Sequence, residues 1–149
     1  LVDAGVPVGL GVDGAASNES ARLLEEAHQA VLMARARGGP TALTTRTAIE
    51  LATIGGARIL GRDKEIGSIE VGKLADLVLW DLSRLAHADI DDPIAALVLG
   101  AIPPIRASWV NGAQVVADAE MLTVDTDAVA ADCAHEHRRL LDKATGVHS

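Results

Sequence analysis

Apolar and polar positions alternate at the start of the chain and then change to helical spacing. Over residues 6–12 every second position carries a large apolar side chain, which predicts a strand. Over residues 23–34 apolar side chains recur three and four positions apart, which predicts a helix that ends before the glycines and proline of residues 38–40. Ser17 or Asn18 is expected to cap this helix. The opening is therefore predicted to be a strand, a short loop and a long helix.

The rest of the chain is predicted to contain a helical part and then a mostly β part, with a boundary near Gly61. Thr44 is expected to cap a second helix that runs to about Thr53, where a pair of glycines at 55–56 interrupts it. Asn111-Gly112 lies between two apolar runs and predicts a hairpin. The other expected elements are a turn-rich strand region at 67–73, a strand at 75–80, a short helix at 92–100, a short strand at 121–124 and a terminal helix at 125–143 with Asp125 at its cap.

Composition and charge limit the classes of molecule that the protein is expected to bind. The chain has 149 residues, of which 49% are hydrophobic, with no Phe, no Tyr and two Trp, so Ala, Val, Leu and Ile must fill the core. The net charge of −8 and the lack of a basic stripe argue against a nucleic-acid polymer as partner. Cys133 is the only cysteine, which excludes an internal disulfide and fits a cytoplasmic protein. No apolar run is long enough to span a membrane, so we expect no membrane partner.

Asp13 is the first residue for which chemistry is expected. It follows the predicted strand directly, and the carboxyl ends of strands hold the active sites of parallel α/β folds and of (β/α)8 barrels. A carboxylate there can ligate a metal or accept a proton from water. The alternative is a loop aspartate that hydrogen-bonds its own turn. A dinucleotide-binding glycine pattern at residues 9–14 is disfavoured, because the helix is predicted to start too late to follow it.

The histidines do not form a ligand set. They are His28, His87, His135, His137 and His148. His135 and His137 are two residues apart in a predicted helix, where their side chains diverge by about 200° and cannot share one ion. His28 is expected to pack on its helix, and His148 lies in the tail. Zinc needs three or four ligands, and this chain offers one, Asp13. The chain by itself therefore cannot complete a zinc site.

Three segments together resemble the amidohydrolase superfamily, in its cytosine deaminase and chlorohydrolase branch. They are Val8-Gly9-Leu10-Gly11-Val12-Asp13-Gly14-Ala15-Ala16-Ser17-Asn18, then residues 48–61, and then Ile66-Gly67-Ser68-Ile69-Glu70-Val71-Gly72-Lys73-Leu74-Ala75-Asp76-Leu77-Val78. Val110-Asn111-Gly112 adds to the resemblance, which covers nearly the whole chain. Its first segment looks most like 8-oxoguanine deaminases and hydroxyatrazine ethylaminohydrolases, and S-adenosylhomocysteine deaminases carry a similar one. The chain begins with Leu rather than Met, and we interpret it as the C-terminal fragment of such an enzyme.

The resemblance implies an α/β fold, comprising the C-terminal part of a (β/α)8 barrel and the C-terminal half of a small β-sandwich. Residues 1–60 would hold the last barrel strand and helices, residues 61–122 the sandwich part, and residues 123–149 the terminal helix. It also implies that Asp13 binds one Zn²⁺ or Fe²⁺ per chain and accepts a proton from water. The other metal ligands and the proton-shuttling glutamate lie outside this chain, as do most residues that would bind substrate.

The sequence therefore predicts a fragment, inactive alone, of a metal-dependent aminohydrolase that deaminates a purine- or triazine-like ring. The best candidate is an 8-oxoguanine deaminase, with a small heterocyclic substrate and a homo-oligomeric full-length parent. The alternatives within the family are a triazine hydrolase and an S-adenosylhomocysteine deaminase. The alternative of a different class is a non-enzymatic β-rich interaction domain, in which Asp13 would be an exposed turn residue without a catalytic role.

Overall fold

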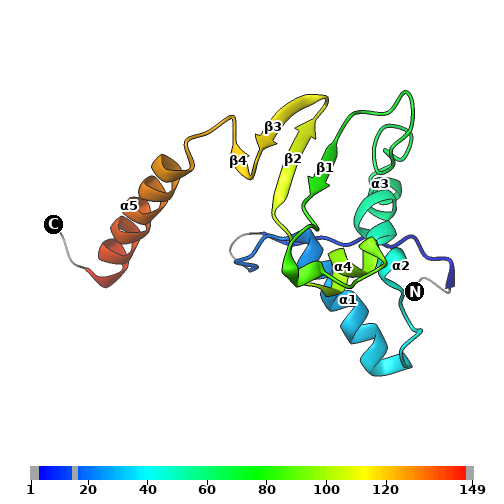
Figure 1. The fold of residues 1–149 in the computed structure, drawn as a ribbon. Coiled ribbons are helices and arrows are strands. Elements are labelled where there is room, and N and C mark those ends of the chain that lie inside the picture. The colour runs from blue at the N-terminus through cyan, green and yellow to red at the C-terminus, as the bar shows by residue number, and fades with distance from the viewer. Residues whose placement is uncertain (1–3, 15–16, 147–149) are drawn as a thin grey trace.

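A group of helices lies below a small sheet, and the last helix stands apart from both (Figure 1). These are features of a computed structural model, which describes residues 4–14 and 17–146. Helices and strands are both present, so the predicted α/β class is confirmed at that level. The division of the chain at residues 60 and 122 stays a prediction.

The helical group is built from two long stretches of helix and a short one. Helix α1 spans Leu23–Gly38, and helix α4 spans Pro93–Leu99. Between them in sequence, α2 (Thr45–Glu50), a π-helical turn η2 (Leu51–Gly55) and α3 (Gly56–Ile59) follow one another without a break. A short 3-10 helix η3 (Leu85–His87) precedes α4.

The helix cap predicted at Thr44 is confirmed, and α4 also begins at a side-chain cap. The Thr44 hydroxyl accepts a hydrogen bond from the Thr47 amide at 3.1 Å and begins α2. The Asp92 carboxylate accepts from the Ile94 amide at 2.9 Å and begins α4, within the short helix predicted at residues 92–100. Side chains that accept from these otherwise unpaired amides stabilise a helix start by about 1 kcal/mol.

The predictions for the start of α1 and for the glycine pair are wrong. Arg22 is the residue before α1, and no side chain caps it. Ser17 and Asn18 lie too early to do so, because the loop is about four residues longer than the pattern suggested. Gly55 and Gly56 do not interrupt the second helix, since both have helical backbone angles and the chain continues through η2 into α3.

The strand predicted over residues 6–12 is not formed within the described part of the chain. These residues carry no strand assignment, and their backbone instead contacts η2, where the Leu10 amide donates to the Leu51 carbonyl at 3.1 Å. A strand requires a neighbouring strand for its ladder of hydrogen bonds, and the described residues offer none here. The alternating pattern thus correctly indicates an extended segment but not a paired one.

The sheet is antiparallel with the strands in sequence order, β1-β2-β3-β4. Strand β1 is Leu77–Trp80, β2 is Ile105–Val110, β3 is Ala113–Ala117 and β4 is Glu120–Met121. The predicted hairpin is confirmed, because Asn111 and Gly112 join β2 to β3 with positive φ angles of 48° and 80°. The strand region predicted at residues 67–73 is absent, and turns occupy it.

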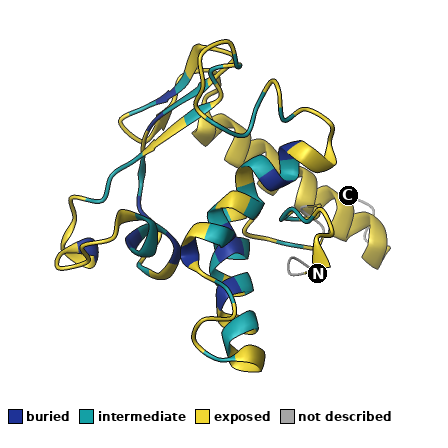
Figure 2. Cartoon of the chain, turned by 90° about the vertical axis from the view of Figure 1, so that its right-hand side faces the viewer, coloured by how far each residue is buried: buried dark blue, intermediate teal, exposed yellow. Residues whose placement is uncertain are grey.

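The hydrophobic core lies among the helices rather than under the sheet. Its fully buried members are Ala27, Val31, Ala48 and Val98, which come from α1, α2 and α4. Figure 2 shows buried segments along the helices. Helix α4 follows β1 in the sequence but packs on α1 and α2. As the composition predicts, the core is made of small aliphatic side chains, which allow the three helices to approach closely.

Helix α5, Thr126–Thr145, contributes nothing to this core. The Asp125 carboxylate accepts from the Asp127 and Ala128 amides, both at 3.0 Å, which confirms the predicted cap. No residue of α5 is buried, and the helix lies away from the other elements (Figure 1). Among the described residues no helix combines the length and apolarity needed to cross a membrane.

The core predicts a clear difference between neighbouring positions on α1. Replacing Val31 by Ala removes two methyl groups from a fully buried site, and we expect the free energy of unfolding to fall by about 2 kcal/mol. Gln29→Ala, at an exposed position two residues earlier, should change it by less than about 0.5 kcal/mol. Urea denaturation of the full-length protein followed by circular dichroism measures both, and equal effects would show that the core is elsewhere.

Candidate active site

The Asp13 carboxylate is held by two short hydrogen bonds within its own loop. Its Oδ1 accepts from the Gly14 amide at 2.8 Å, and its Oδ2 accepts from the Ser17 hydroxyl at 3.0 Å. The backbone of Asp13 is left-handed, with φ of 61°, a conformation that Asp tolerates better than most residues. The amides of Ser17 and Asn18 both donate to the Gly14 carbonyl, at 2.9 and 3.0 Å, and close the loop.

Asp13 hydrogen-bonds its own turn, as expected of a loop aspartate without a catalytic role. The same geometry is also compatible with a metal-binding carboxylate. A carboxylate has about four acceptor positions, and donors from the described residues, the Gly14 amide and the Ser17 hydroxyl, use two of them. The Asp13 side chain is exposed, so the remaining positions are accessible. Asp13 therefore fits the role of one oxygen ligand to a metal while its orientation is set by the loop. Whether it has that role stays a prediction.

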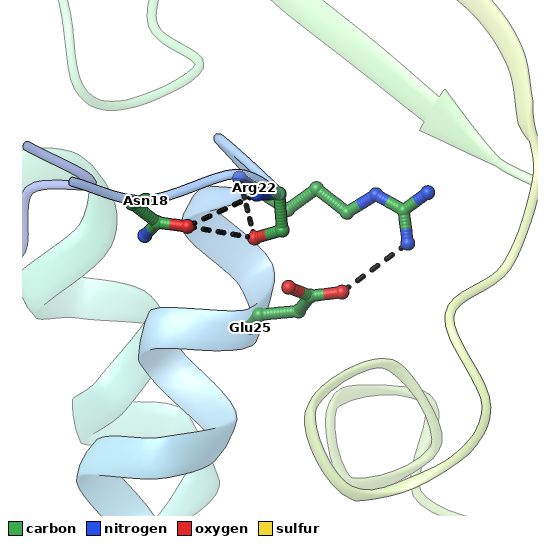
Figure 3. Close-up of polar contacts among 4 residues, drawn as sticks. Asn18, Arg22 and Glu25 are labelled. Atoms are coloured by element: carbon green, nitrogen blue, oxygen red, sulfur yellow. Dashed lines mark hydrogen bonds and ion pairs between the residues drawn. The ribbon is translucent and has the colours of Figure 1, made fainter. Parts of the chain in front are cut away.

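Asn18 attaches the loop to the first turns of α1. Its Nδ2 donates to Glu26 Oε1 at 2.7 Å. Its Oδ1 accepts from both the Ser20 amide and the Ser20 hydroxyl, at 3.2 and 3.1 Å (Figure 3). The Glu26 contact is partly buried, which strengthens a charge-assisted hydrogen bond. Sequence reasoning missed Glu26. Its pairing with Asn18 can be recognised only once the start of α1 at Leu23 is known.

Arg22 and Glu25 form an exposed pair beside this network. Their guanidinium and carboxylate lie 3.2 Å apart, and such pairs contribute little to stability (Figure 3). The nearby Ser20 hydroxyl and the Arg22 guanidinium hold the pKa of Glu25 below its usual value. The Ser20 hydroxyl also donates to Asn18, so the network continues from the Asp13 loop into α1.

A cavity of about 670 Å³ lies elsewhere, between η2 and the turns of residues 63–73. Lys73 reaches into this region, but its ammonium group has three donors and three protein partners. They are the Asp63 carbonyl at 2.5 Å, the Ser68 hydroxyl at 2.5 Å and the Glu70 carboxylate at 3.2 Å. The ammonium is thus fully used in holding the turns, and the cavity has no free cation from Lys73 to bind a ligand.

The histidines have structural positions. His28 Nδ1 donates to the Val98 carbonyl at 2.8 Å, and the buried His87 Nε2 donates to the Ala101 carbonyl at 2.7 Å, so both attach to the chain at the end of α4. His135 and His137 are exposed on α5, as the spacing argument expects. His148 lies outside the described residues. Over residues 4–14 and 17–146, no three His, Cys, Asp or Glu side chains gather to hold a metal.

Comparison with known proteins identifies the family. The profile of the Amidohydrolase family matches residues 1–122, most of the chain. The chain belongs to the amidohydrolase family. The resemblance seen in its sequence motifs is thereby confirmed, and it extends through the Asp13 loop, the helical group and the sheet.

Relatives within the amidohydrolase family include deaminases. The chain is 39% identical to the 5-methylthioadenosine/S-adenosylhomocysteine deaminase of Desulforudis audaxviator, over 95% of this chain and 34% of that protein. It is 41% identical to the 8-oxoguanine deaminase of Pseudomonas aeruginosa, over 88% of this chain and 29% of that protein. The chain thus spans about a third of the length of these relatives.

A solved structure shares both the fold and the sequence signature. The chain superimposes with a TM-score of 0.87 on an adenosine deaminase from Xanthomonas campestris with bound zinc. The two are 35% identical, and the match covers 93% of this chain and 32% of that one. The bound zinc of this amidohydrolase supports the predicted metal dependence, without distinguishing zinc from iron in the present protein.

Two carboxylates accept hydrogen bonds from serine hydroxyls, and we expect the pKa of each carboxyl to depend on its own serine. The Ser68 hydroxyl donates to Glu70 at 2.5 Å, and this contact, followed by Lys73, holds the pKa of Glu70 below its usual value. The contact therefore stabilises the folded protein at pH values above the usual pKa of a glutamate. This stabilisation is lost as the pH falls through the lowered pKa of Glu70. Ser68→Ala should raise the pKa of Glu70, as measured by NMR titration of the carboxyl carbon.

A second serine provides the matched control for this titration. The Ser83 hydroxyl donates to Asp81 at 2.6 Å and, with the Ser83 amide, holds the pKa of Asp81 below its usual value. Ser83→Ala should raise the pKa of Asp81 and leave Glu70 unchanged. If Ser68→Ala leaves the pKa of Glu70 unaltered, the hydroxyl contact does not determine it.

Proposed function

We propose that this chain supplies a metal-binding carboxylate, Asp13, to a hydrolytic deaminase of the amidohydrolase family. The observation that carries this proposal is the Asp13 carboxylate itself. It lies at the end of an extended segment and is oriented by Gly14 and Ser17, and the described residues leave two of its acceptor positions unused. The 41% identity to an 8-oxoguanine deaminase supports a purine-like ring, 8-oxoguanine first, as the substrate.

The architecture proposed for the full-length enzyme places this segment in a barrel. Residues 6–12 have the pattern of a strand and lie against helices, and they lack only strand neighbours, which a (β/α)8 barrel supplies on both sides. The exposed edge of β1 would likewise pair with strands of a composite β-sandwich. On this proposal the chain is the C-terminal third of the enzyme.

Asp13 has two tasks in the proposed reaction. Its carboxylate would hold one zinc or iron together with ligands from the rest of the enzyme, and a metal in such a site acidifies water and so provides a nucleophile near neutral pH. Asp13 Oδ accepts the proton that water gives up. The oxygen of water bonds to the ring carbon that bears the amino group, and one proton of the water reaches the adjacent ring nitrogen. The second proton reaches the amino nitrogen, the bond from the carbon to that nitrogen breaks, and ammonia leaves as the ring carbonyl forms.

The loop around Asp13 prepares the carboxylate for these tasks. Hydrogen bonds from the Gly14 amide and the Ser17 hydroxyl fix the rotation of the carboxylate. Because the orientation is fixed before substrate binds, little of it must be ordered during the reaction. We propose no substrate-binding residues in this chain, since the groups that distinguish one ring from another would come from other barrel loops.

Two other substrate classes remain as alternatives to 8-oxoguanine. The 39% identity to a 5-methylthioadenosine/S-adenosylhomocysteine deaminase supports that substrate class, and the resemblance of the Asp13 segment to hydroxyatrazine ethylaminohydrolases supports a triazine ring. A small heterocycle as substrate, a homo-oligomeric full-length enzyme and a cytoplasmic location, the last in keeping with a single free cysteine, complete the proposal.

The deciding experiment is Asp13→Asn in the full-length protein. Asn keeps the shape of the side chain but removes the charge and the proton acceptor. We expect the wild type to hold about one metal per chain and to release ammonia, and Asp13→Asn to lower kcat by about 100- to 10,000-fold. The released amine is measured as ammonia with 8-oxoguanine and S-adenosylhomocysteine and as ethylamine with hydroxyatrazine, and metal content by elemental analysis.

Asp132 is the matched control, because it is an exposed aspartate on α5 far from the Asp13 loop in the sequence. Asp132→Asn should keep wild-type activity. Full activity in Asp13→Asn, or a wild type that deaminates without bound metal, would show that Asp13 is only a turn residue. Release of the expected amine from one substrate alone would choose among the three substrate classes.

A further inference from the structure

The extended segment before Asp13 is held by the π-helical turn η2. The Leu10 amide donates to the Leu51 carbonyl, the first residue of η2, at 3.1 Å. A π turn departs from the regular spacing of helix hydrogen bonds and can direct a carbonyl to a partner outside the helix. Asp13 follows Leu10 by three residues, so the contact is made close to the candidate catalytic side chain.

Two glycines allow the segment and the helix to touch through their backbones. A Cβ on Gly55 would lie 2.6 Å from the Val8 carbonyl oxygen, and a Cβ on Gly9 would lie 2.9 Å from the Gly56 Cα. Both distances are shorter than real side chains adopt, and the obstructing atoms are backbone. Any side chain at either position must therefore push the segment and the helix apart.

Gly55 is not required by its own backbone conformation. Its φ of −61° and ψ of −49° are ordinary helical values, which alanine adopts more favourably than glycine. A buried glycine in a helix weakens that helix unless another contact benefits. Here the benefit is the approach of Val8, which brings the segment within hydrogen-bonding distance of η2.

The Asp13 loop is thus fixed on both sides. Before Asp13, the segment contacts η2 through Val8 and Leu10; after it, Asn18 is bonded to Glu26 of α1. Only a few residues separate each attachment from the carboxylate. A displacement of the segment at η2 is therefore transmitted to Asp13, since the other attachment prevents the loop from following as a whole.

We propose that Gly55 and the π turn Leu51–Gly55 are positioning elements for the Asp13 carboxylate. They set how closely the segment approaches the helix, and so where Asp13 lies relative to the rest of the active site. This inference rests on the proposed function for the role of Asp13, but the contact itself does not. It assigns a purpose to an irregular helical turn that the packing of the core does not explain.

Adjacent glycines provide a matched pair of variants. Gly55→Ala and Gly56→Ala make the same change in the same helix at nearly the same backbone angles. Only the first meets an obstruction, because a Cβ on Gly56 would have its nearest neighbour, the Leu51 carbonyl oxygen, at 4.0 Å. In the full-length metal-loaded enzyme, we expect Gly55→Ala to lower kcat by about 10- to 100-fold. KM and metal content should stay within about twofold, and Gly56→Ala should match the wild type.

Amide hydrogen exchange tests the contact without relying on activity. Gly55→Ala should speed exchange of the Leu10 amide by about tenfold or more, because its bond to Leu51 is broken, whereas Gly56→Ala should not. If the wild type proves not to be a deaminase, the proposed function fails, and the exchange comparison still decides whether Gly55 positions the segment.

A second variant covers the case in which Gly55→Ala does not fold. Gly9→Ala meets the same contact from the segment side and should produce the same loss of kcat and the same faster exchange. The inference is overturned if Gly55→Ala equals Gly56→Ala in both kcat and Leu10 exchange. It is also overturned if kcat and metal content fall together, since that pattern indicates a general loss of structure.

Discussion

The backbone contact between residues 8–10 and the π turn determines where the chain places its one candidate catalytic group. The contact depends on the absence of side chains at Gly9 and Gly55 and on one hydrogen bond from Leu10 to Leu51. The described residues give the segment no neighbouring strand, so this contact and the packing of the Leu10 side chain against the core hold it on the helices. The helix that receives the segment is in turn held by Ala48 in the core, so the position of Asp13 depends on the packing of α1, α2 and α4.

That core is small, and its size explains why so much apolar surface remains exposed. In the described part of the chain four residues form the fully buried cluster, and none is larger than valine. Large apolar side chains are exposed on the sheet and on α5, among them Leu79 of β1 and Leu140 and Leu141 of α5. Large apolar side chains in water are unfavourable, and where they gather into a patch they normally mark a contact with further protein. This agrees with the fact that the chain spans only about a third of its amidohydrolase relatives.

Sequence reasoning succeeded where structure depends on neighbouring residues. The caps at Thr44 and Asp125 and the turn at Asn111-Gly112 are determined by side chains and backbone angles within a few positions, and all three were predicted correctly. It failed where the outcome depends on residues distant in sequence. Gly55 and Gly56 were predicted to interrupt the helix because glycine disfavours helices, but the approach of Val8 from the other end of the chain gives Gly55 a use within one.

The same distinction applies to the candidate site. Asp13 could be singled out because it follows an alternating segment, and the motif around it identified the family. Glu26 and the π turn could not, because each acts on the Asp13 loop across a fold that the pattern does not reveal. A single carboxylate cannot make a metal site, so what this part of the fold can contribute is accuracy of placement. Two attachments flank Asp13, one through backbone atoms and one through a charge-assisted hydrogen bond. They allow a chain with so small a core to place the Asp13 carboxylate accurately.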